Sequence, residues 1–315
     1  MKKINIQAIM PLVLLLVLFV VLSALNSNFL SASTMMNLMQ QVSAVGTVAI
    51  GGMMVIITGG IDFSAGYGLA MTGMAAAWIF THSVFRGSVV AMLVTFPLVG
   101  ALIGLANGFL TAKLKILPFI ATLAMMSITQ GLTMFINGGT MMMIRDPRLL
   151  MIGQGRIADF LPVSFLVYLG VCAAAAFILR RTKLGVYNYA MGGSEQALWY
   201  AGINVQAYKM LVYAAAGVCT GIASLLTVTQ IAMATPNIAG SILIDSIAAS
   251  CIGGASLSGG RGSVFGAFMG TMIIVLIGTA LTYLSVPAEM RGVFKGVVIL
   301  LAVALDAVIT LRYGK

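Results

Sequence analysis

The sequence predicts an all-α polytopic membrane protein with about ten transmembrane helices and both termini in the cytoplasm. The 315-residue chain is 61% hydrophobic and only 8% charged, whereas soluble domains carry about 25% charged residues. Asp62 is the only charged residue between Lys3 and Arg86, and none lies between Lys115 and Arg145. Because a spanning helix needs roughly 20 mostly apolar residues, these long uncharged intervals accommodate several spans.

Ten apolar runs are the candidate spans. The first follows Lys2-Lys3 as in a signal peptide, but Pro11 and the absence of a small-x-small cleavage site favour a retained helix. The second and third runs are nearly fused, and the eighth is short enough to be re-entrant instead of spanning. In chain order the runs cover residues 8–25, 42–59, 64–80, 88–111, 117–136, 163–179, 210–229, 242–256, 263–284 and 292–311.

The distribution of basic residues predicts the topology. With the N-terminus in the cytoplasm and ten crossings, 11 of the 17 basic residues lie inside and 6 outside, in the direction of the positive-inside rule. The clearest signal is Arg180-Arg181-x-Lys183, directly after the sixth run. We expect residues 1–315 to form a single transmembrane domain, with an external loop at about 137–162 and a cytoplasmic loop at about 180–209.

Charge, cysteines and missing motifs argue against several other classes. The formal net charge of +10 comes from basic residues scattered between apolar runs, which indicates topology and not nucleic-acid binding. Cys172, Cys219 and Cys251 lie in apolar stretches without a C-x-x-C pair, so they are typical of small buried hydrophobic residues and not of a metal site. The chain has no G-x-x-x-x-G-K-[ST] phosphate loop, and nucleotide-driven work would need a partner.

No catalytic constellation is evident, so we expect a protein that is not itself an enzyme. His82 is the only histidine and stands in a short polar loop beside Arg86. Asp62, Asp245 and Asp306 lack the Gly-x-Gly-Asp setting of an intramembrane aspartyl dyad. Acidic residues in apolar surroundings are costly and usually face the protein interior. For Asp62, Asp245 and Lys295, a helix cap or an ion pair is at least as good an interpretation as a transport role.

Glycine spacing predicts close packing between helices. Small residues four apart share one face of a helix and allow two backbones to approach closely. This spacing occurs in three groups, which are Gly100, Gly104 and Gly108; Gly262, Gly266 and Gly270; and Gly217 with Gly221.

A second glycine pattern, Gly-Gly-x-x-x-Ser-x-Gly, occurs twice. Many transporters contain repeats of inverted topology, but ten spans place both copies on the same side of the membrane. Two alternatives stay open: the repeat is coincidental, or the span count is wrong by one near residue 240. The motif glycines are Gly59, Gly60 and Gly66 in the first copy and Gly253, Gly254 and Gly260 in the second.

Polar side chains within or beside the apolar runs are candidates for a solute path. A conduit for a neutral polar solute needs hydrogen-bonding groups that hold the solute weakly enough to release it. The alternative role for each is a hydrogen bond between helices, or for Asp62 a cap on the following helix. The path candidates are Gln40, Gln41, Asp62, Ser64, Asn107 and Gln130, and Asn37 and Gln230 share this setting.

The cytoplasmic loop contains a predicted two-turn helix that ends at Gly202. Gly192-Gly193 predicts a flexible turn before it, Ser194 is a good N-cap, and the helix dipole favours Glu195 in the first turn. Such a short helix is not stable alone, and its aromatic, small and acidic surface favours docking of another protein over a position on the membrane surface. The candidate docking residues are Gly193, Ser194, Glu195, Ala197, Ala201 and Gly202.

Five sequence segments resemble the permeases of ribose-type ABC importers, a family that also serves xylose, arabinose and galactose. They occur in the family's order and cover nearly the whole chain. Ser194 replaces a common Asn, and Phe63 replaces a common Leu. The segments begin at Thr58 (TGGIDFSAG), Pro118 (PFIATL), Tyr189 (YAMGG), Gly202 (GINV) and Asp245 (DSIAA, continuing into GGASLSGG from Gly253).

The resemblance implies a type II ABC importer-like permease of the bacterial inner membrane that translocates a sugar such as ribose. It implies that the chain binds no cofactor, because ATP and Mg²⁺ belong to a cytoplasmic ATPase docked on the 193–202 helix. It also implies a second permease copy, in a homodimer or a homologous heterodimer, and an extracytoplasmic sugar-binding protein. Arg145 and Arg148 in the external loop are our candidates for contacting that protein. An ion-coupled secondary transporter of a small polar solute is the alternative function.

Overall fold

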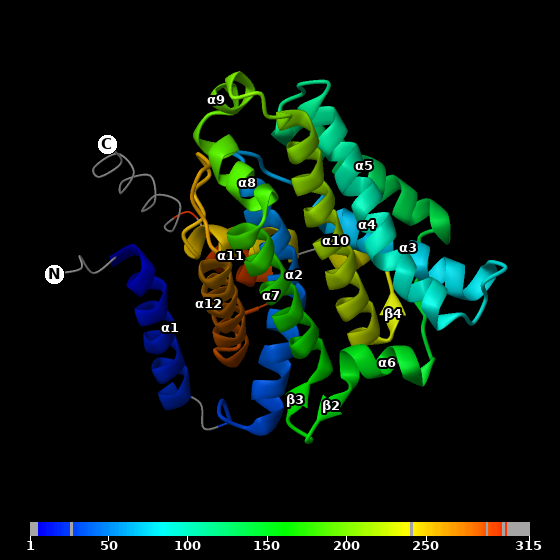
Figure 1. Cartoon of the computed structure of the whole chain (residues 1–315). Helices are drawn as coiled ribbons and strands as arrows, with labels where there is room; N and C mark the ends of the chain where they lie inside the picture. The colour runs from blue at the N-terminus through cyan, green and yellow to red at the C-terminus, as the bar shows by residue number, and fades with distance from the viewer. Residues whose placement is uncertain (1–5, 26–27, 240–241, 288, 298–299, 301–315) are drawn as a thin grey trace.

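The computed structural model describes all residues except 1–5, 26–27, 240–241, 288, 298–299 and 301–315. Within the described part the protein is a bundle of helices (Figure 1). The helices are α1 (Ile6–Leu25), α2 (Ala32–Ile57), α3 (Ala65–His82), α4 (Val89–Ala112), α5 (Pro118–Ile136), α6 (Pro147–Gln154), α7 (Val163–Arg181), α8 (Lys183–Gly193), α9 (Glu195–Tyr200), α10 (Val205–Ile231), the 3-10 helix η1 (Pro236–Ala239), α11 (Ile242–Ile252) and α12 (Val264–Tyr283).

Two pairs of very short antiparallel strands connect the helices at one end of the bundle. β1 (Met142–Met143) pairs with β4 (Met233–Ala234), and β2 (Arg156–Ile157) pairs with β3 (Leu161–Pro162). The first pair ties the 137–162 segment to the chain that follows α10. These strands and α6 lie at the end of the molecule opposite α9 (Figure 1).

Helices occur at nine of the ten predicted apolar runs within the described residues, and the tenth, 292–311, lies mostly outside them. Six described helices are long and apolar enough to cross a membrane, namely α2, α4, α5, α7, α10 and α12. α11 has 11 residues and is therefore about 16 Å long, roughly half the hydrocarbon thickness of a bilayer. The count of ten spans and the cytoplasmic placement of both termini stay predictions.

Two helices begin earlier in the chain than the apolar runs predicted, because a polar side chain caps each of them. α2 begins at Ala32 because the Ser31 hydroxyl accepts a hydrogen bond from the Thr34 N–H at 3.3 Å. α10 begins at Val205 because the Asn204 side chain accepts from the Ala207 N–H at 3.0 Å. Each cap satisfies an N–H group that lacks a partner within its own helix.

The predicted flexible turn at Gly192-Gly193 is wrong, because both glycines belong to α8. Gly192 packs directly against the chain, and a Cβ there would overlap the Ile57 carbonyl oxygen and the Gly260 nitrogen. Glycine thus serves close backbone contact at this position. The chain turns only at Ser194, which has an extended backbone.

α4 and α10 form the tightest helix pair, as the glycine spacing predicted. A Cβ on Gly100 would overlap the Gly217 carbonyl, and one on Gly221 would overlap the Phe96 carbonyl. At Gly108 the added Cβ would lie 2.7 Å from the Met210 Cα. Because residue numbers rise along one helix as they fall along the other, the two helices are antiparallel.

The third glycine group is only partly a helix face. Gly266 and Gly270 lie in α12, where a Cβ would overlap the carbonyls of Gly253 and Ala249. Gly262 instead precedes the helix and has an extended φ of 158°. The predicted triplet therefore reduces to a pair that packs α12 against α11.

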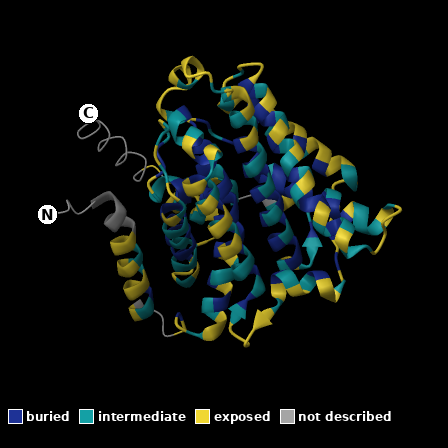
Figure 2. Ribbon diagram, viewed as in Figure 1, coloured by how far each residue is buried: buried dark blue, intermediate teal, exposed yellow. Residues whose placement is uncertain are grey.

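α2 is the central helix of the bundle. It packs against α7, α10, α11 and α12, and most of its residues from Val42 to Ile57 are buried. By contrast, α1 and α5 turn many exposed residues outward (Figure 2). Exposed apolar side chains on α5, such as Phe135 at 84%, indicate a face suited to lipid or to another chain.

The two glycine motifs lie side by side at the end of the bundle near α8. The Gly260 N–H donates to the Ile57 carbonyl at 2.8 Å. Gly59 and Gly254 both have a positive φ, 80° and 87°, and end α2 and α11 in the same left-handed conformation. Because both motifs lie at the same end of the bundle, they are not the two copies of an inverted repeat on opposite sides of the membrane.

Candidate functional site

The predicted docking helix is α9, a single short helix on the surface. The Ser194 Oγ accepts from the Ala197 N–H at 3.1 Å, which confirms the predicted N-cap. Gly202 follows the helix with a φ of 76°. The side chains of Trp199 and Tyr200 are 68% and 80% exposed, so α9 presents two adjacent aromatic rings to the solvent.

An ion pair joins α9 to the bundle. The Lys209 Nζ on α10 lies 2.5 Å from the Glu195 Oε1. All six predicted docking residues are exposed, and the structure therefore brings them together on one surface. Their role in docking stays a prediction. Lys209 was not among the candidates, because its partner on the neighbouring helix cannot be identified from sequence spacing.

Three of the six path candidates form one buried cluster where α3 begins. The Asp62 Oδ1 accepts hydrogen bonds from the Ser64 N–H at 2.9 Å and the Ser64 Oγ at 2.6 Å. The Asn107 Nδ2 on α4 donates to the Ser64 Oγ at 2.7 Å. The N-cap residue of α3 is Ser64, and Asp62 holds that residue in place instead of capping the helix itself. The segment is held from the other side by Thr122 on α5, whose hydroxyl donates to the Ile61 carbonyl at 3.1 Å.

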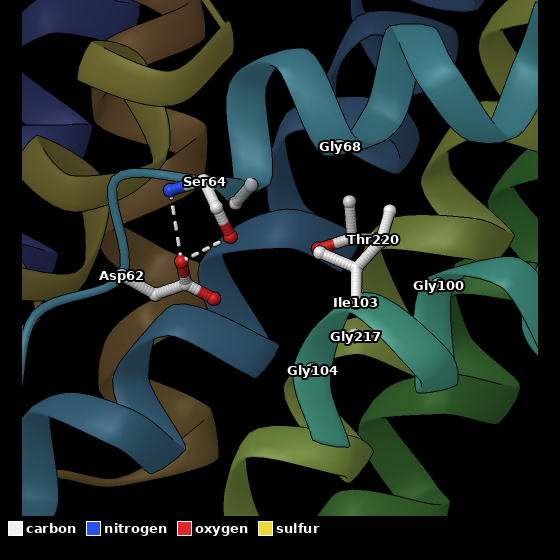
Figure 3. A pocket seen from close by; sticks show the side chains of 9 residues that line it. Asp62, Ser64, Gly68, Gly100, Ile103, Gly104, Gly217 and Thr220 are labelled. Atoms are coloured by element: carbon white, nitrogen blue, oxygen red, sulfur yellow. Dashed lines mark hydrogen bonds between the residues drawn. The ribbon is translucent and has the colours of Figure 1, made fainter. Parts of the chain in front are cut away.

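A small cavity adjoins this cluster. Figure 3 shows Asp62 and Ser64 on one side of it and Ile103 and Thr220 on the other. Its volume of about 10 Å³ holds about one water molecule and not a sugar. In this conformation the cluster is therefore a packed joint between α3, α4 and α10 and not an open path.

The other path candidates lie elsewhere. Gln40 donates to the Gly153 carbonyl at 3.1 Å and accepts from the Gln230 Nε2 at 3.3 Å, so it connects α2 with α6 and α10. Gln130 on α5 donates to the Tyr67 hydroxyl at 3.0 Å. Gln41 is exposed and lines a groove between α2 and α12. The candidates thus occupy four separate places.

The external-loop candidates flank the start of α6. Asp146 caps this helix by accepting from the Arg148 N–H at 2.9 Å, and its carboxylate pairs with the Arg148 guanidinium at 2.7 Å. Hydrogen bonds from the Arg148 side chain hold the pKa of the Asp146 carboxyl below its usual range. Arg145 and Arg148 are both exposed, but Arg148 is already paired with Asp146, so Arg145 supplies most of the positive charge of this surface.

Asp245 and Lys295 form an ion pair, as one of their two interpretations predicted. The Lys295 Nζ lies 2.8 Å and 3.0 Å from the two carboxylate oxygens. Both side chains are largely buried, with exposed fractions of 8% for Asp245 and 19% for Lys295. The pair links the short helix α11 to residues 289–297, which are helical. Within the described residues, no group of three or more His, Cys, Asp or Glu side chains is placed to hold a metal.

Comparisons with known proteins agree on one family. The family described as "Branched-chain amino acid transport system / permease component" matches residues 34–303. The ribose import permease RbsC of Escherichia coli K12 is 37% identical over 298 residues, which are 94% of this chain and 92% of the relative. RbsC of Bacillus subtilis is 34% identical over 311 residues, 97% and 95% of the two chains.

A third relative is the galactose/methyl galactoside import permease MglC of Salmonella typhimurium. It is 32% identical over 318 residues, which cover 96% of this chain and 94% of the relative. No solved structure matches the chain. With six helices that are apolar and long enough to cross a bilayer, this is a multi-pass inner-membrane protein. The chain belongs to the family of transport-system permease components that includes the ribose, arabinose and galactose ABC importer permeases.

Proposed function

We propose that this chain is the permease subunit of an ATP-driven ribose importer. The observation that carries the proposal is the similarity to ribose import permeases of two bacteria, at 37% and 34% identity over 94% and 97% of the chain. ATP hydrolysis belongs to a separate cytoplasmic ATPase, because this chain has no phosphate-binding loop. An extracytoplasmic sugar-binding protein delivers the substrate.

The names found by the comparisons point to two different substrate classes. The family description mentions branched-chain amino acids, whereas the relatives are named as ribose or galactose permeases. A zwitterionic amino acid calls for charged partners, whereas a neutral sugar calls for uncharged donors and acceptors. The exposed groove beside Gln41 is lined only by uncharged residues. This lining supports the sugar.

α9 is the coupling helix in this proposal. Its exposed Trp199 and Tyr200 rings offer the apolar, rigid surface that protein interfaces favour. The ion pair between Glu195 and Lys209 passes a displacement of α9 to α10. α10 in turn contacts α4 through backbone atoms, and such a stiff pair moves as one body.

At the opposite end of the bundle, α6 and its basic residues face the binding protein. The guanidinium groups of Arg145 and Arg148 suit acidic side chains on that partner. This arrangement corresponds to a single permease domain with ten spans, both termini inside, α9 in the cytoplasm and α6 outside. A second permease copy completes the transporter and covers exposed helix faces of this one.

Purification from the native membrane in mild detergent tests the proposal. The tagged chain should bring with it a protein with an ATP-binding loop, identified by mass spectrometry, and the complex should hydrolyse ATP faster when ribose-loaded binding protein is added. A secondary transporter has no such partner. The ion-coupled secondary transporter would be the better assignment if repeated purifications bring no ATPase and if uptake stops when an uncoupler is added.

A further inference from the structure

The groove beside Gln41, between α2 and α12, is lined by uncharged residues, most of them polar. Its volume is about 190 Å³, enough for a molecule of monosaccharide size. On α2 the lining residues recur at helical spacing and share one face. The polar lining residues are Thr34, Asn37 and Gln41 from α2 and Thr279, Thr282 and Tyr283 from α12.

The groove lies on the half of the bundle away from α9. It is formed by the N-terminal half of α2 and the C-terminal half of α12, and these ends point toward α6, β2 and β3 (Figure 1). In the proposed topology this half faces the binding protein. Substrate released from that protein reaches the groove before it reaches any other cavity described above.

Two exposed amides on α2 require an explanation. α2 has 26 residues and is about 39 Å long, more than the roughly 30 Å of a bilayer's hydrocarbon core, and Asn37 and Gln41 are exposed just before its apolar run at 42–59. An amide that faces hydrocarbon loses its hydrogen bonds with water, which costs free energy. This face therefore meets water or protein instead of lipid.

The chemistry of the lining selects the occupant. Amides and hydroxyls both donate and accept hydrogen bonds, and so do the hydroxyls of a sugar. The Tyr283 ring is held in place, because its hydroxyl lies 2.8 Å from the Thr34 Oγ1 and its ring contacts Phe29 edge-on. An ordered ring beside amides offers both an apolar surface and polar contacts to a sugar.

We propose that this groove is the outer sugar-binding site of the permease, with Asn37 and Gln41 as the residues that contact the sugar hydroxyls. The proposal rests on the proposed function and names the substrate path within it. At the inner end of the groove, Gly278 lies close to the Asp245–Lys295 ion pair, since a Cβ on Gly278 would be 3.8 Å from the Lys295 Nζ. Sugar that moves inward from Gln41 meets this pair next.

Cysteine labelling tests the site directly. In a parent chain with Cys172, Cys219 and Cys251 replaced by alanine, Asn37→Cys or Gln41→Cys is exposed to a membrane-impermeant thiol reagent added from outside. Both variants should react, and ribose supplied with its binding protein should slow the reaction several-fold, because a sugar bound in the groove blocks access to the thiol. Val84→Cys, in the exposed loop between α3 and α4, is the control and should react at the same rate with and without ribose.

Transport by the parent chain distinguishes failure of the groove assignment from failure of the proposed function. If the parent imports ribose but the Asn37→Cys and Gln41→Cys variants react equally with and without sugar, the groove is not the site and the proposed function stands. Spontaneous disulfides between two copies of either variant, without sugar protection, would make the groove a dimer interface and overturn the proposal. A parent that folds but imports no ribose contradicts the proposed function itself. As a second readout, Gln41→Leu should lower ribose import about 5-fold, whereas Ser127→Val should leave it unchanged.

Discussion

The Glu195 carboxylate on α9 and the Lys209 ammonium on α10 are 2.5 Å apart. This ion pair connects the exposed docking helix with the long helix behind it. Lys209 is 11% exposed and Glu195 is 44% exposed, so the pair is only partly screened by solvent. Because Glu195 is nearly half exposed, the pair adds little to the stability of the fold, and its main effect is on the orientation of α9.

Reversal of one charge should uncouple transport without unfolding the protein. Glu195→Lys places two ammonium groups together, so α9 loses its fixed orientation and ATP-driven uptake falls several-fold. The free energy of unfolding should change by no more than about 1 kcal/mol, which is the most that exposed ion pairs usually contribute. The double variant Glu195→Lys with Lys209→Glu restores the attraction, and uptake should recover in part. Equal uptake in the single variant and the wild type would contradict this role.

The close backbone contact between α4 and α10 should tolerate no added side chain. Gly217→Leu has to separate two backbones in direct contact, and overpacking of this kind costs about 1–3 kcal/mol or more. Thermal unfolding in detergent, followed by size-exclusion chromatography, should show a clear loss of stability. Gly170→Leu on α7 is the matched control, because a Cβ there meets nothing within 4 Å. Similar losses of stability for both variants would contradict the close packing of α4 against α10.

Asp62 should behave as a structural residue and not as a proton carrier. Asp62→Asn keeps an oxygen that accepts from the Ser64 N–H and hydroxyl, and ATP-driven uptake should continue. Asp62→Leu leaves these buried donors without a partner, which costs about 1–3 kcal/mol for each, and the amount of folded protein should drop. Complete loss of uptake by a stably folded Asp62→Asn variant would favour the ion-coupled alternative.

The Asp245–Lys295 pair should be more costly to break than to replace. Lys295→Met leaves the buried Asp245 carboxylate without its cation, and such a loss costs about 3–5 kcal/mol. The double variant Asp245→Leu with Lys295→Met removes both charges, so its melting temperature should lie closer to that of the wild type. A double variant less stable than Lys295→Met would contradict the prediction.

The fold was predictable where physical signals are local. Long uncharged runs identified the helices, and Ser194 and Gly202 marked the ends of α9. By contrast, α6 and α8 are short and were missed by a search for long apolar runs. The interpretation of Gly192 as a turn failed because its contacts with Ile57 and Gly260 come from distant parts of the chain.

The candidate site was predictable only in part for the same reason. Asp62 and Ser64 are neighbours in sequence, and their hydrogen-bond geometry follows from that spacing. From the sequence, Gln40 and Gln41 were both candidates for the solute path. In the structure Gln40 bonds to Gly153 and Gln230, whereas Gln41 lines the groove. Adjacent residues on a helix point about 100° apart, and which of them meets a neighbour depends on packing of the whole bundle.

Reconstituted transport shows whether ATP or an ion gradient drives this permease. The purified permease, its co-purifying ATPase and the sugar-binding protein are assembled in liposomes, and uptake of labelled ribose is measured with and without ATP. For an ATP-driven importer, accumulation requires both ATP and the binding protein and continues in the presence of proton and sodium ionophores. Accumulation that needs no ATP and collapses with an ionophore would contradict ATP-driven import.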